Sequence, residues 1–254
     1  MKKIIVCADH EIGYQIINYI LSENSNHFEI LDIYTTETNE NGFWRPLKDI
    51  PNLKKYKIFQ NNHCFLGDID QKNIDYIFLI SWKYIFSDEI IKKINFGIIN
   101  LHYSLLPNYP GVYPVNNAII SGEKITGITF HFIDELIDKG YLLHQKSINI
   151  KLTDTVDSLL ARLDRLSLKE FKKIWVGKIK LTKKKKLSNK MQKNYTHKQF
   201  EYSNKLDPHK KYTALELVNL IRGKTFKNHK YLYLETTDNK KFFISIKVSE
   251  GKEV

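Results

Sequence analysis

The feature that most constrains the fold is a series of short apolar runs separated by stretches with helical periodicity. Residues 3–8 (KIIVCA), 75–81 (DYIFLIS) and 97–101 (GIINL) are apolar at most positions. Such runs suit strands that are buried on both faces, as in a parallel sheet. Residues 14–21 and 84–94 place apolar side chains at helical spacing between these runs. The alternation predicts an α/β fold with a mostly parallel sheet.

Further elements follow in the middle of the chain. Residues 28–34 predict another strand, and residues 127–134 alternate apolar and polar side chains, as a half-buried strand does. Residues 142–150 predict a strand that pairs with it. Thr153 and Asp154 then cap a long amphipathic helix that we expect to run to about Trp175.

A basic segment, residues 178–190, marks the expected domain boundary. Its Lys183–Lys186 run is interpreted as either a phosphate-binding patch or a solvated loop, and the loop is favoured. Beyond it, residues 212–225 predict a helix, and Tyr231–Leu234 with Phe242–Ile246 predict a β-hairpin. We therefore expect a main domain over residues 1–180 and a small helix-plus-hairpin domain over residues 191–254.

Composition excludes several classes of protein. The two cysteines, Cys7 and Cys64, are too few for a disulfide scaffold or a four-cysteine zinc site, and Cys7 is expected in the core. The formal net charge of +12 makes anionic small molecules or nucleic acid plausible partners, but a Lys-rich composition alone is weak evidence for nucleic acid, and we expect no nucleic-acid partner. No apolar run approaches the roughly 20 residues of a membrane span, so we expect a soluble cytoplasmic protein that does not bind a membrane.

The stretch Asn100-Leu101-His102 carries the first sign of chemistry. If residues 97–101 form a strand, Asn100 and His102 point to the same face at its carboxyl end. Ligands of open α/β sheets bind at the carboxyl ends of strands. A carboxamide beside an imidazole suits a reaction that builds an oxyanion and moves a proton. In isolation, the pair is more typical of an Asn and a His that hydrogen-bond loop backbone than of a catalytic site.

A second motif extends the first. Asp134 and Asp138 follow the predicted strand 127–134, and Asp138 stands two residues before Gly140. Alone, these carboxylates are interpreted as loop caps. Together, N-x-H-x-SLLP, Gly111, TGIT and D-x-x-x-D-x-G resemble the folate-dependent formyltransferase family. The resemblance is strong over residues 75–145 and extends by pattern over 1–175.

The resemblance implies a Rossmann-like catalytic domain and a set of site residues. Asn100, His102 and Asp138 match the family's catalytic residues, and the 36 positions between His102 and Asp138 are the family's usual separation. Transfer of a formyl group from 10-formyltetrahydrofolate to a primary amine is implied. Asn100 and protonated His102 would donate to the oxyanion, while Asp138 would hold the ring and favour its charged form. No metal is expected.

The resemblance also places the folate. The loop whose backbone receives the pterin matches Tyr84, Ile85 and Phe86. The loop on the other side of the pterin matches Ile133, Asp134, Glu135, Leu136, Ile137 and Asp138. The residues expected to flank the pocket are Ser104, Leu105, Leu106 and Pro107.

Three formyl acceptors are weighed. The tRNA-directed relatives carry a C-terminal barrel of about a hundred residues, and the residues after the basic segment are too few for it. The glycinamide ribonucleotide enzymes carry a glycine-rich phosphate loop near the start, whereas residues 7–13 contain only Gly13. The short sugar N-formyltransferases share the pattern L-x-x-L-I-R-x-x-T-F, seen here at Leu217–Phe226. The likeness to that branch implies a dTDP-linked amino-dideoxysugar as substrate, with a product destined for O-antigen or a related surface glycan.

Candidate contacts to the nucleotide sugar follow from this interpretation. Arg222 and Lys224 are assigned to the pyrophosphate because charge-assisted contacts to phosphate oxygens are strong. Trp82 and Phe226 are candidates for stacking on thymine or sugar. Lys83 and Tyr113 are the remaining residues expected to contact the nucleotide sugar.

Two further hypotheses concern function and assembly. An alternative to the enzyme is an idle folate- or nucleotide-sugar-binding module on the same fold, and a tRNA-directed enzyme is the second alternative. The apolar face of the predicted hairpin needs a partner, so we expect it to pack on the main domain or across a homodimer interface.

Overall fold

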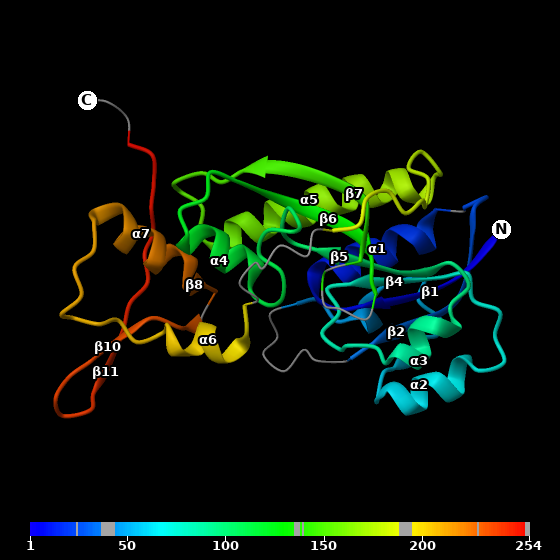
Figure 1. Ribbon diagram of the computed structural model, residues 1–254, viewed down its shortest axis with the longest axis horizontal. Coiled ribbons are helices and arrows are strands. Elements are labelled where there is room, and N and C mark those ends of the chain that lie inside the picture. The colour runs from blue at the N-terminus through cyan, green and yellow to red at the C-terminus, as the bar shows by residue number, and fades with distance from the viewer. Residues whose placement is uncertain are drawn as a thin grey trace. The chain divides into compact units, whose positions relative to one another are not determined.

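The computed structural model describes residues 1–23, 25–36, 44–134, 138, 140–187, 195–227 and 229–251. Its elements, in chain order, are β1 Lys2–Ala8, α1 His10–Ser22, β2 Phe28–Thr35, η1 Leu47–Asp49, β3 Lys57–Ile58, α2 Asn62–Ile69, β4 Tyr76–Ile80, α3 Asp88–Lys93, β5 Gly97–His102, α4 Pro114–Ile120, β6 Ile125–Phe132, β7 Tyr141–Asn149, α5 Val156–Trp175, α6 His197–Tyr202, α7 Ala214–Gly223, β8 Thr225–Phe226, β9 His229–Lys230, β10 Tyr233–Glu235 and β11 Lys241–Phe243 (Figure 1).

The chain divides into two compact units, each assembled from three segments of the sequence. The first unit comprises residues 1–102, 129–145 and 164–188, and the second comprises residues 103–128, 146–163 and 189–254. Asn100, His102 and Asp138, the three candidate catalytic residues, therefore all belong to the first unit.

A seven-stranded sheet with the order β3-β2-β1-β4-β5-β6-β7 forms the framework. Strands β3, β2, β1, β4 and β5 pair in parallel, and β6 runs antiparallel to β5. This arrangement confirms the predicted α/β fold with a mostly parallel sheet. Each expected strand between residues 3 and 150 is present within a few positions of its predicted bounds.

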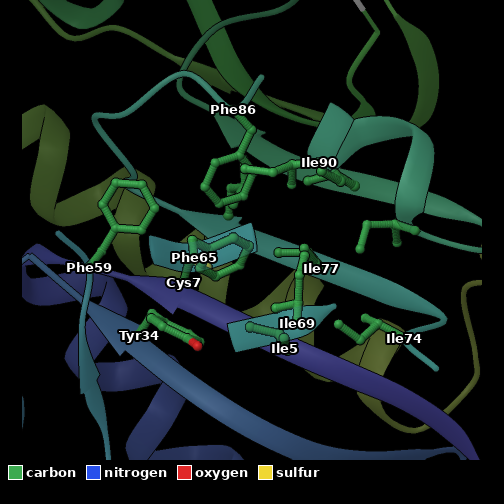
Figure 2. Close-up of a cluster of buried hydrophobic side chains, with 13 residues drawn as sticks. Ile5, Cys7, Tyr34, Phe59, Phe65, Ile69, Ile74, Ile77, Phe86 and Ile90 are labelled. Atoms are coloured by element: carbon green, nitrogen blue, oxygen red, sulfur yellow. The ribbon is translucent and has the colours of Figure 1, made fainter. Parts of the chain in front are cut away.

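Helices cover both faces of the parallel part of the sheet, as the apolar runs require. On one face, Ile5 and Ile77 of the strands pack with Phe65 of α2 and Ile90 of α3, and Cys7 lies in the same cluster (Figure 2). The burial predicted for Cys7 is confirmed, and it raises the pKa of the thiol. On the other face, Phe78 contacts Phe171 of α5 edge to face, with ring centroids 5.7 Å apart.

One expectation about local structure was wrong. The strand over 127–134 is not half-buried, because Thr129 and His131 on its polar side are fully buried. The sheet continues on both sides of β6, and these polar groups find partners there: Gln145 donates to the Thr129 hydroxyl at 2.9 Å. The helix expected within 84–94 is present as Asp88–Lys93, with Ser87 at its N-cap position.

Sequence patterns also failed to indicate α2, whose start is fixed by Asn61. The Asn61 carboxamide oxygen accepts a hydrogen bond from the backbone N–H of Cys64, a side-chain cap of the helix N-terminus. The helix is short and its apolar face is limited to two buried side chains, Phe65 and Ile69. Such a short helix is stabilised by its packing rather than by periodicity that can be read from the sequence.

In the second unit, α4 packs on α7 and the predicted hairpin is present. The Asn116 side chain donates to the backbone carbonyl of Gly223 at 2.9 Å, and a methyl group at Gly223 would lie 2.5 Å from Ile120. Strands β10 and β11 pair antiparallel, with Leu234 opposite Phe242. This confirms the helix and hairpin expected near the C-terminus. Phe242 and its neighbour Phe243 are about half exposed.

The Lys183–Lys186 run keeps exposed side chains, but its backbone is not a free loop. Lys184 and Lys185 exchange backbone hydrogen bonds with Leu142 at 2.9 and 2.8 Å, so the run extends the edge of the sheet beside β7. Within the residues that the structure describes, no helix has the length and apolar character needed to cross a membrane.

Candidate functional site

Asn100 and His102 lie at the carboxyl end of β5, and β6 brings a third polar side chain beside them. In the antiparallel register, Asn100 faces His131 and His102 faces Thr129. The Asn100 amide nitrogen lies 3.2 Å from His131 Nε2. His102 and His131 stand edge to face, with ring centroids 6.4 Å apart. The sheet therefore holds one carboxamide and two imidazoles together.

Asp138 joins this group from the loop after β6. Its carboxylate oxygens lie 3.6 Å from His102 Nδ1 and 3.4 Å from His131 Nε2. The side chains of Asp138 and His102 are 9% and 7% exposed, and that of His131 is fully buried. Asp138 has a φ of 55°, a left-handed conformation that aspartate tolerates better than most residues. One carboxylate thus faces both imidazoles at once.

The backbone that carries Asp138 leaves no room for a side chain at Gly140. A methyl group there would lie 1.7 Å from the carbonyl oxygen of Phe132, at the end of β6. Gly140 is therefore required for the close approach that brings the loop back to the sheet. The sequence signal D-x-G is explained by this contact.

The four side chains form an arrangement that suits acyl transfer. An amide and an imidazole can donate hydrogen bonds to a developing oxyanion, and a carboxylate next to the imidazole stabilises its protonated form. The group is largely withdrawn from water, which strengthens each electrostatic interaction. Among the described residues, no group of three or more histidine, cysteine, aspartate or glutamate side chains is arranged to hold a metal ion.

The loop after β4 holds the residues expected to meet the pterin. Ile85 is 70% exposed and Tyr84 is 40% exposed, whereas Phe86 is buried and stacks on Phe65 with ring centroids 4.8 Å apart. The Asn62 side chain donates to the Ile85 carbonyl at 3.0 Å and so ties the tip of this loop to α2. The loop combines a fixed backbone with an exposed apolar tip.

Trp82 and Lys83 begin the same loop. The Trp82 ring packs edge to face on Phe59, at 5.2 Å between centroids, and leans on the core that includes Phe86. Its indole N–H is buried with no acceptor among the described residues. Lys83 is exposed, with its ammonium 5.3 Å from the Tyr84 ring centre. Trp82 therefore has less freedom to stack on a ligand than its sequence position suggested.

The second expected folate loop is described only in part. Ile133 is half-buried against the core on the Phe86 side of the sheet, and Asp134 pairs with Lys186 at 3.8 Å. Glu135, Leu136 and Ile137 lie outside the described residues.

The stretch Ser104–Pro107 belongs to the second unit. Ser104 is fully buried and donates to the Asn108 carbonyl at 2.6 Å, and Leu106 is buried as well. Leu105 is half-buried, and Pro107 follows a cis peptide bond. The buried Ser104 hydroxyl fixes the turn rather than facing a ligand.

Tyr113 and Phe226 also lie in the second unit. Tyr113 stacks on Phe200 with ring centroids 4.0 Å apart, and its hydroxyl lies 3.1 Å from His197 Nδ1. It adopts a left-handed φ of 55° immediately before α4. Phe226 is half-buried.

The expected pyrophosphate role of Arg222 and Lys224 does not agree with their environment. Both side chains are buried, at 3% and 1% exposed. Arg222 donates to the carbonyls of Lys151 and Asp154 at 2.8 and 3.0 Å. These contacts occupy the guanidinium inside the unit, so it has no surface to offer a phosphate.

Lys224 is enclosed in the same way. Its ammonium donates to the Phe200 carbonyl, the Ser203 hydroxyl and the Asn204 carboxamide oxygen at 2.7, 2.8 and 2.7 Å. Burial lowers the pKa of the Lys224 ammonium to about 7. The pattern L-I-R-x-x-T-F therefore encodes two buried cations that join α7 to neighbouring backbone.

The sequence pattern gave no sign that His131 belongs to the site. It stands in the strand pattern T-G-I-T-F-H-F, where alternation marked it as a solvent-facing polar residue. Pairing of β5 with β6 would have placed it opposite Asn100, but the register between two strands 30 positions apart is a tertiary property.

Comparison with known proteins identifies the family. The Formyl transferase family matches residues 25–173, more than half of the chain. The chain belongs to the formyl transferase family. The four clustered side chains described above all lie within that match. A second family, the N-formyltransferase dimerization C-terminal domain, matches residues 199–250 of this formyl transferase.

Curated relatives are longer than this chain. The bifunctional polymyxin resistance protein ArnA of Wigglesworthia glossinidia brevipalpis is 34% identical over 165 residues, which is 63% of this chain and 25% of that protein. A methionyl-tRNA formyltransferase of Caldanaerobacter subterraneus subsp. tengcongensis is 34% identical over 166 residues, 60% of this chain and 54% of that protein. The chain thus spans between a quarter and about half of the length of these relatives.

Solved structures share the fold over nearly the whole chain. A sugar N-formyltransferase from Shewanella sp. FDAARGOS_354 is 21% identical, with a TM-score of 0.83 and coverage of 99% of this chain and 100% of that one. An N-formyltransferase from Helicobacter canadensis, in complex with folinic acid and dTDP-3-aminofucose, is 22% identical, with a TM-score of 0.70 and coverage of 94% and 85%. At these identities the likeness establishes the fold.

Proposed function

We propose that this protein transfers a formyl group from 10-formyltetrahydrofolate to the amine of a dTDP-linked amino-dideoxysugar. The observation that carries the reaction class is the cluster of Asn100, His102, His131 and Asp138 at the carboxyl edge of the sheet. The match of residues 199–250 to the dimerization domain of N-formyltransferases supports the choice of acceptor. The proposed product belongs to O-antigen or related surface-glycan synthesis.

Each clustered side chain has a task in the proposed reaction. Asn100 donates its amide N–H to the oxygen of the formyl group as negative charge develops there. His102 takes the proton that the attacking amine loses and returns it to the nitrogen that departs from the formyl carbon. A C–N bond to the amine forms while the C–N bond to the donor breaks, so no oxidant or metal is needed. Asp138 orients His102 and stabilises its protonated form.

The loop after β4 fits a flat aromatic ligand. Its exposed Ile85 and partly exposed Tyr84 offer apolar surface, and the Asn62 contact fixes the backbone groups around them. Exposed apolar side chains on a fixed loop are typical of a binding site. We assign Tyr84, Ile85 and Phe86 to one side of the pterin, and Ile133 with Asp134 to the other. When bound, the folate supplies the formyl group.

The acceptor side of the site draws on fewer of the predicted residues. Lys83 is exposed at the carboxyl edge of the sheet and is retained as a phosphate contact, whereas Arg222 and Lys224 are withdrawn because they are buried. Trp82 of the first unit remains a candidate for an aromatic contact to the acceptor. The exposed Phe242 and Phe243 of β11 are proposed to lie in a homodimer interface.

A parallel assay tests the proposal. The purified full chain is incubated with 10-formyltetrahydrofolate and, in separate reactions, dTDP-3-aminofucose, dTDP-4-amino-4,6-dideoxyglucose, methionyl initiator tRNA and glycinamide ribonucleotide. Mass spectrometry should detect formylation of a dTDP-sugar, and the His102→Asn variant should abolish it. Formylation of the tRNA alone would replace this proposal by the tRNA-directed alternative. Binding of folate and sugar without turnover would support an idle module.

A further inference from the structure

Three strands of the first unit end on one level at the carboxyl edge of the sheet. In the parallel register, Ala8 of β1 pairs with Ile80 of β4, and Ile80 pairs with Leu101 of β5. The residues that follow these positions form a row across the edge. Ser81 follows Ile80 and His102 follows Leu101, so these two residues lie at the same level of the sheet. His10 comes two positions after Ala8. The row therefore continues the proposed catalytic site toward β1.

His10 and Ser81 are held together in unusual backbone conformations. The Nδ1 atom of His10 lies 2.8 Å from the Ser81 hydroxyl. Their φ angles are 60° and 54°, in the left-handed region that few residues other than glycine adopt. Such conformations cost energy and recur where function requires a side chain in a defined place. The residues that follow two adjacent strands, His10 after β1 and Ser81 after β4, therefore both adopt an unfavourable φ, and their side chains lie beside each other.

An aromatic ring completes the group. The Trp44 ring lies 5.0 Å from the His10 ring, tilted by 41°. Trp44, His10 and Ser81 are all half-buried, so each keeps part of its surface accessible. An imidazole, a hydroxyl and an indole face together offer hydrogen bonds and an apolar surface. A sugar ring presents the complementary features, hydroxyl groups around its rim and C–H groups on its face.

The position of the group is one where the fold favours a ligand. The chain leaves β1 toward β2 on one side of the sheet order, and leaves β4 toward β5 on the other. The boundary between β1 and β4 is therefore the topological switch point, where ligands of open α/β sheets bind. His10 and Ser81 stand on its two sides.

The local charges argue for a neutral ligand group rather than a phosphate. The buried Asp9 carboxylate accepts hydrogen bonds from the Thr35 hydroxyl and from the backbone and hydroxyl of Thr36, at 2.8 to 2.9 Å. It stands at the N-terminus of α1 and offsets the positive end of the helix dipole. Glu11 in the first turn is paired with Arg45. The negative charge of Asp9 would repel a phosphate at this end of the helix. A hydroxyl group is neutral and would not be repelled.

We propose that His10, Ser81 and Trp44 form the subsite for the pyranose ring of the acceptor, with His10 and Ser81 hydrogen-bonded to its hydroxyl groups. The inference rests on the proposed function and adds residues that select the sugar. Neighbouring strands are about 4.8 Å apart, so β4 lies one spacing and β1 two spacings from β5. A sugar on Ser81 and His10 thus presents its amine toward Asn100 and His102.

The test uses variants that preserve the left-handed backbone. Ser81→Gly removes the hydroxyl, and glycine adopts the required φ without strain. His10→Asn removes the imidazole, and asparagine is among the residues that tolerate this region. The matched control is His27→Asn, because His27 is an exposed histidine that precedes β2 at the opposite edge of the sheet. All four proteins are assayed with dTDP-3-aminofucose and dTDP-4-amino-4,6-dideoxyglucose, and calorimetry measures binding of each sugar.

The inference requires a selective loss of sugar recognition. KM and Kd for the sugar should rise about tenfold in Ser81→Gly and in His10→Asn, the effect of one lost hydrogen bond in a site that excludes water. The KM for 10-formyltetrahydrofolate should stay within twofold, and the His27→Asn protein should match wild type. Unchanged sugar constants, or a rise in the folate KM alone, would overturn the subsite.

Failure of the proposed function has a different signature. If the wild-type protein formylates neither sugar, the proposed activity is wrong, and the calorimetry still decides the subsite. Sugar binding that weakens in both variants would keep the subsite. Absence of any sugar binding to wild type would overturn it together with the proposed acceptor class.

Discussion

The sharpest test of the catalytic cluster is the replacement of Asp138 by asparagine. Asparagine has the same shape and tolerates the left-handed φ of 55° at this position. The variant therefore removes one negative charge while the loop can keep its conformation. Asp134→Asn is the matched control, because it makes the same chemical change four positions earlier.

The distances set the expected magnitude. The Asp138 carboxylate lies 3.6 Å from His102 Nδ1, in a group that is less than a tenth exposed. At an effective dielectric constant of about 20, a charge pair at this distance is worth about 4 to 5 kcal/mol. Because each 1.36 kcal/mol changes a rate by about tenfold, the largest possible loss is roughly a thousandfold to five-thousandfold. Asparagine retains a polar contact, so we expect kcat to fall by about a hundredfold to a thousandfold.

The control should behave differently. The Asp134 side chain is 26% exposed, and its ion pair with Lys186 spans 3.8 Å at the surface. Such pairs contribute about 0 to 1 kcal/mol. We expect Asp134→Asn to leave kcat within about threefold and to act on the KM for folate, since Asp134 is assigned to the pterin loop.

The assay is turnover against pH for both variants, with saturating sugar and varied folate. Thermal unfolding checks that each variant is folded. If Asp138→Asn retains the wild-type rate and pH profile while Asp134→Asn loses them, the two carboxylates are assigned the wrong way round. If neither variant changes kcat, the carboxylate–imidazole contact has no part in the reaction.

Four further predictions follow from single contacts. His102→Ala should lower kcat at least a hundredfold in a folded protein, since positioned acid–base groups typically contribute about 10²–10⁴-fold, and near wild-type turnover would remove it from the mechanism. Gly140→Ala should lower both activity and melting temperature, because its methyl group would lie 1.7 Å from a backbone oxygen; a variant with wild-type values contradicts this close approach. Phe242→Lys with Phe243→Lys should convert a dimer into monomers in light scattering, and an unchanged mass at micromolar concentration would place the interface elsewhere. The pKa of Lys224 is about 7 in the folded chain, against an ordinary value of 10.5. Between pH 7 and pH 10.5 the unfolded chain therefore binds more protons at this group than the folded chain does. The free energy of unfolding should then rise with pH over this range. Urea unfolding at pH 7.5 and 9 should show the advantage of wild type over Lys224→Met growing by about 1.4 kcal/mol per pH unit, and a constant difference refutes the lowered pKa.

The amino-acid sequence by itself determined the parallel core of this protein. Runs such as residues 3–8 and 97–101 are short and apolar, and they alternate with helical segments, which is typical of parallel strands covered on both faces. Alternation of side chains along a strand is also sufficient to place Asn100 and His102 on one face. The spacing of His102 and Asp138 indicated the catalytic set only through the family resemblance, because sequence distance sets no contact distance.

Only the tertiary structure decided which polar side chains are buried, and with what partners. His131 reads as an exposed residue of an alternating strand, yet the β5–β6 register turns it toward Asn100 and Asp138. The sequence suggests Lys224 as a phosphate ligand, yet Phe200, Ser203 and Asn204 surround its ammonium with three oxygen acceptors. Periodicity reports which face of an element is apolar, whereas the partner of a polar side chain depends on which distant segments pack against it.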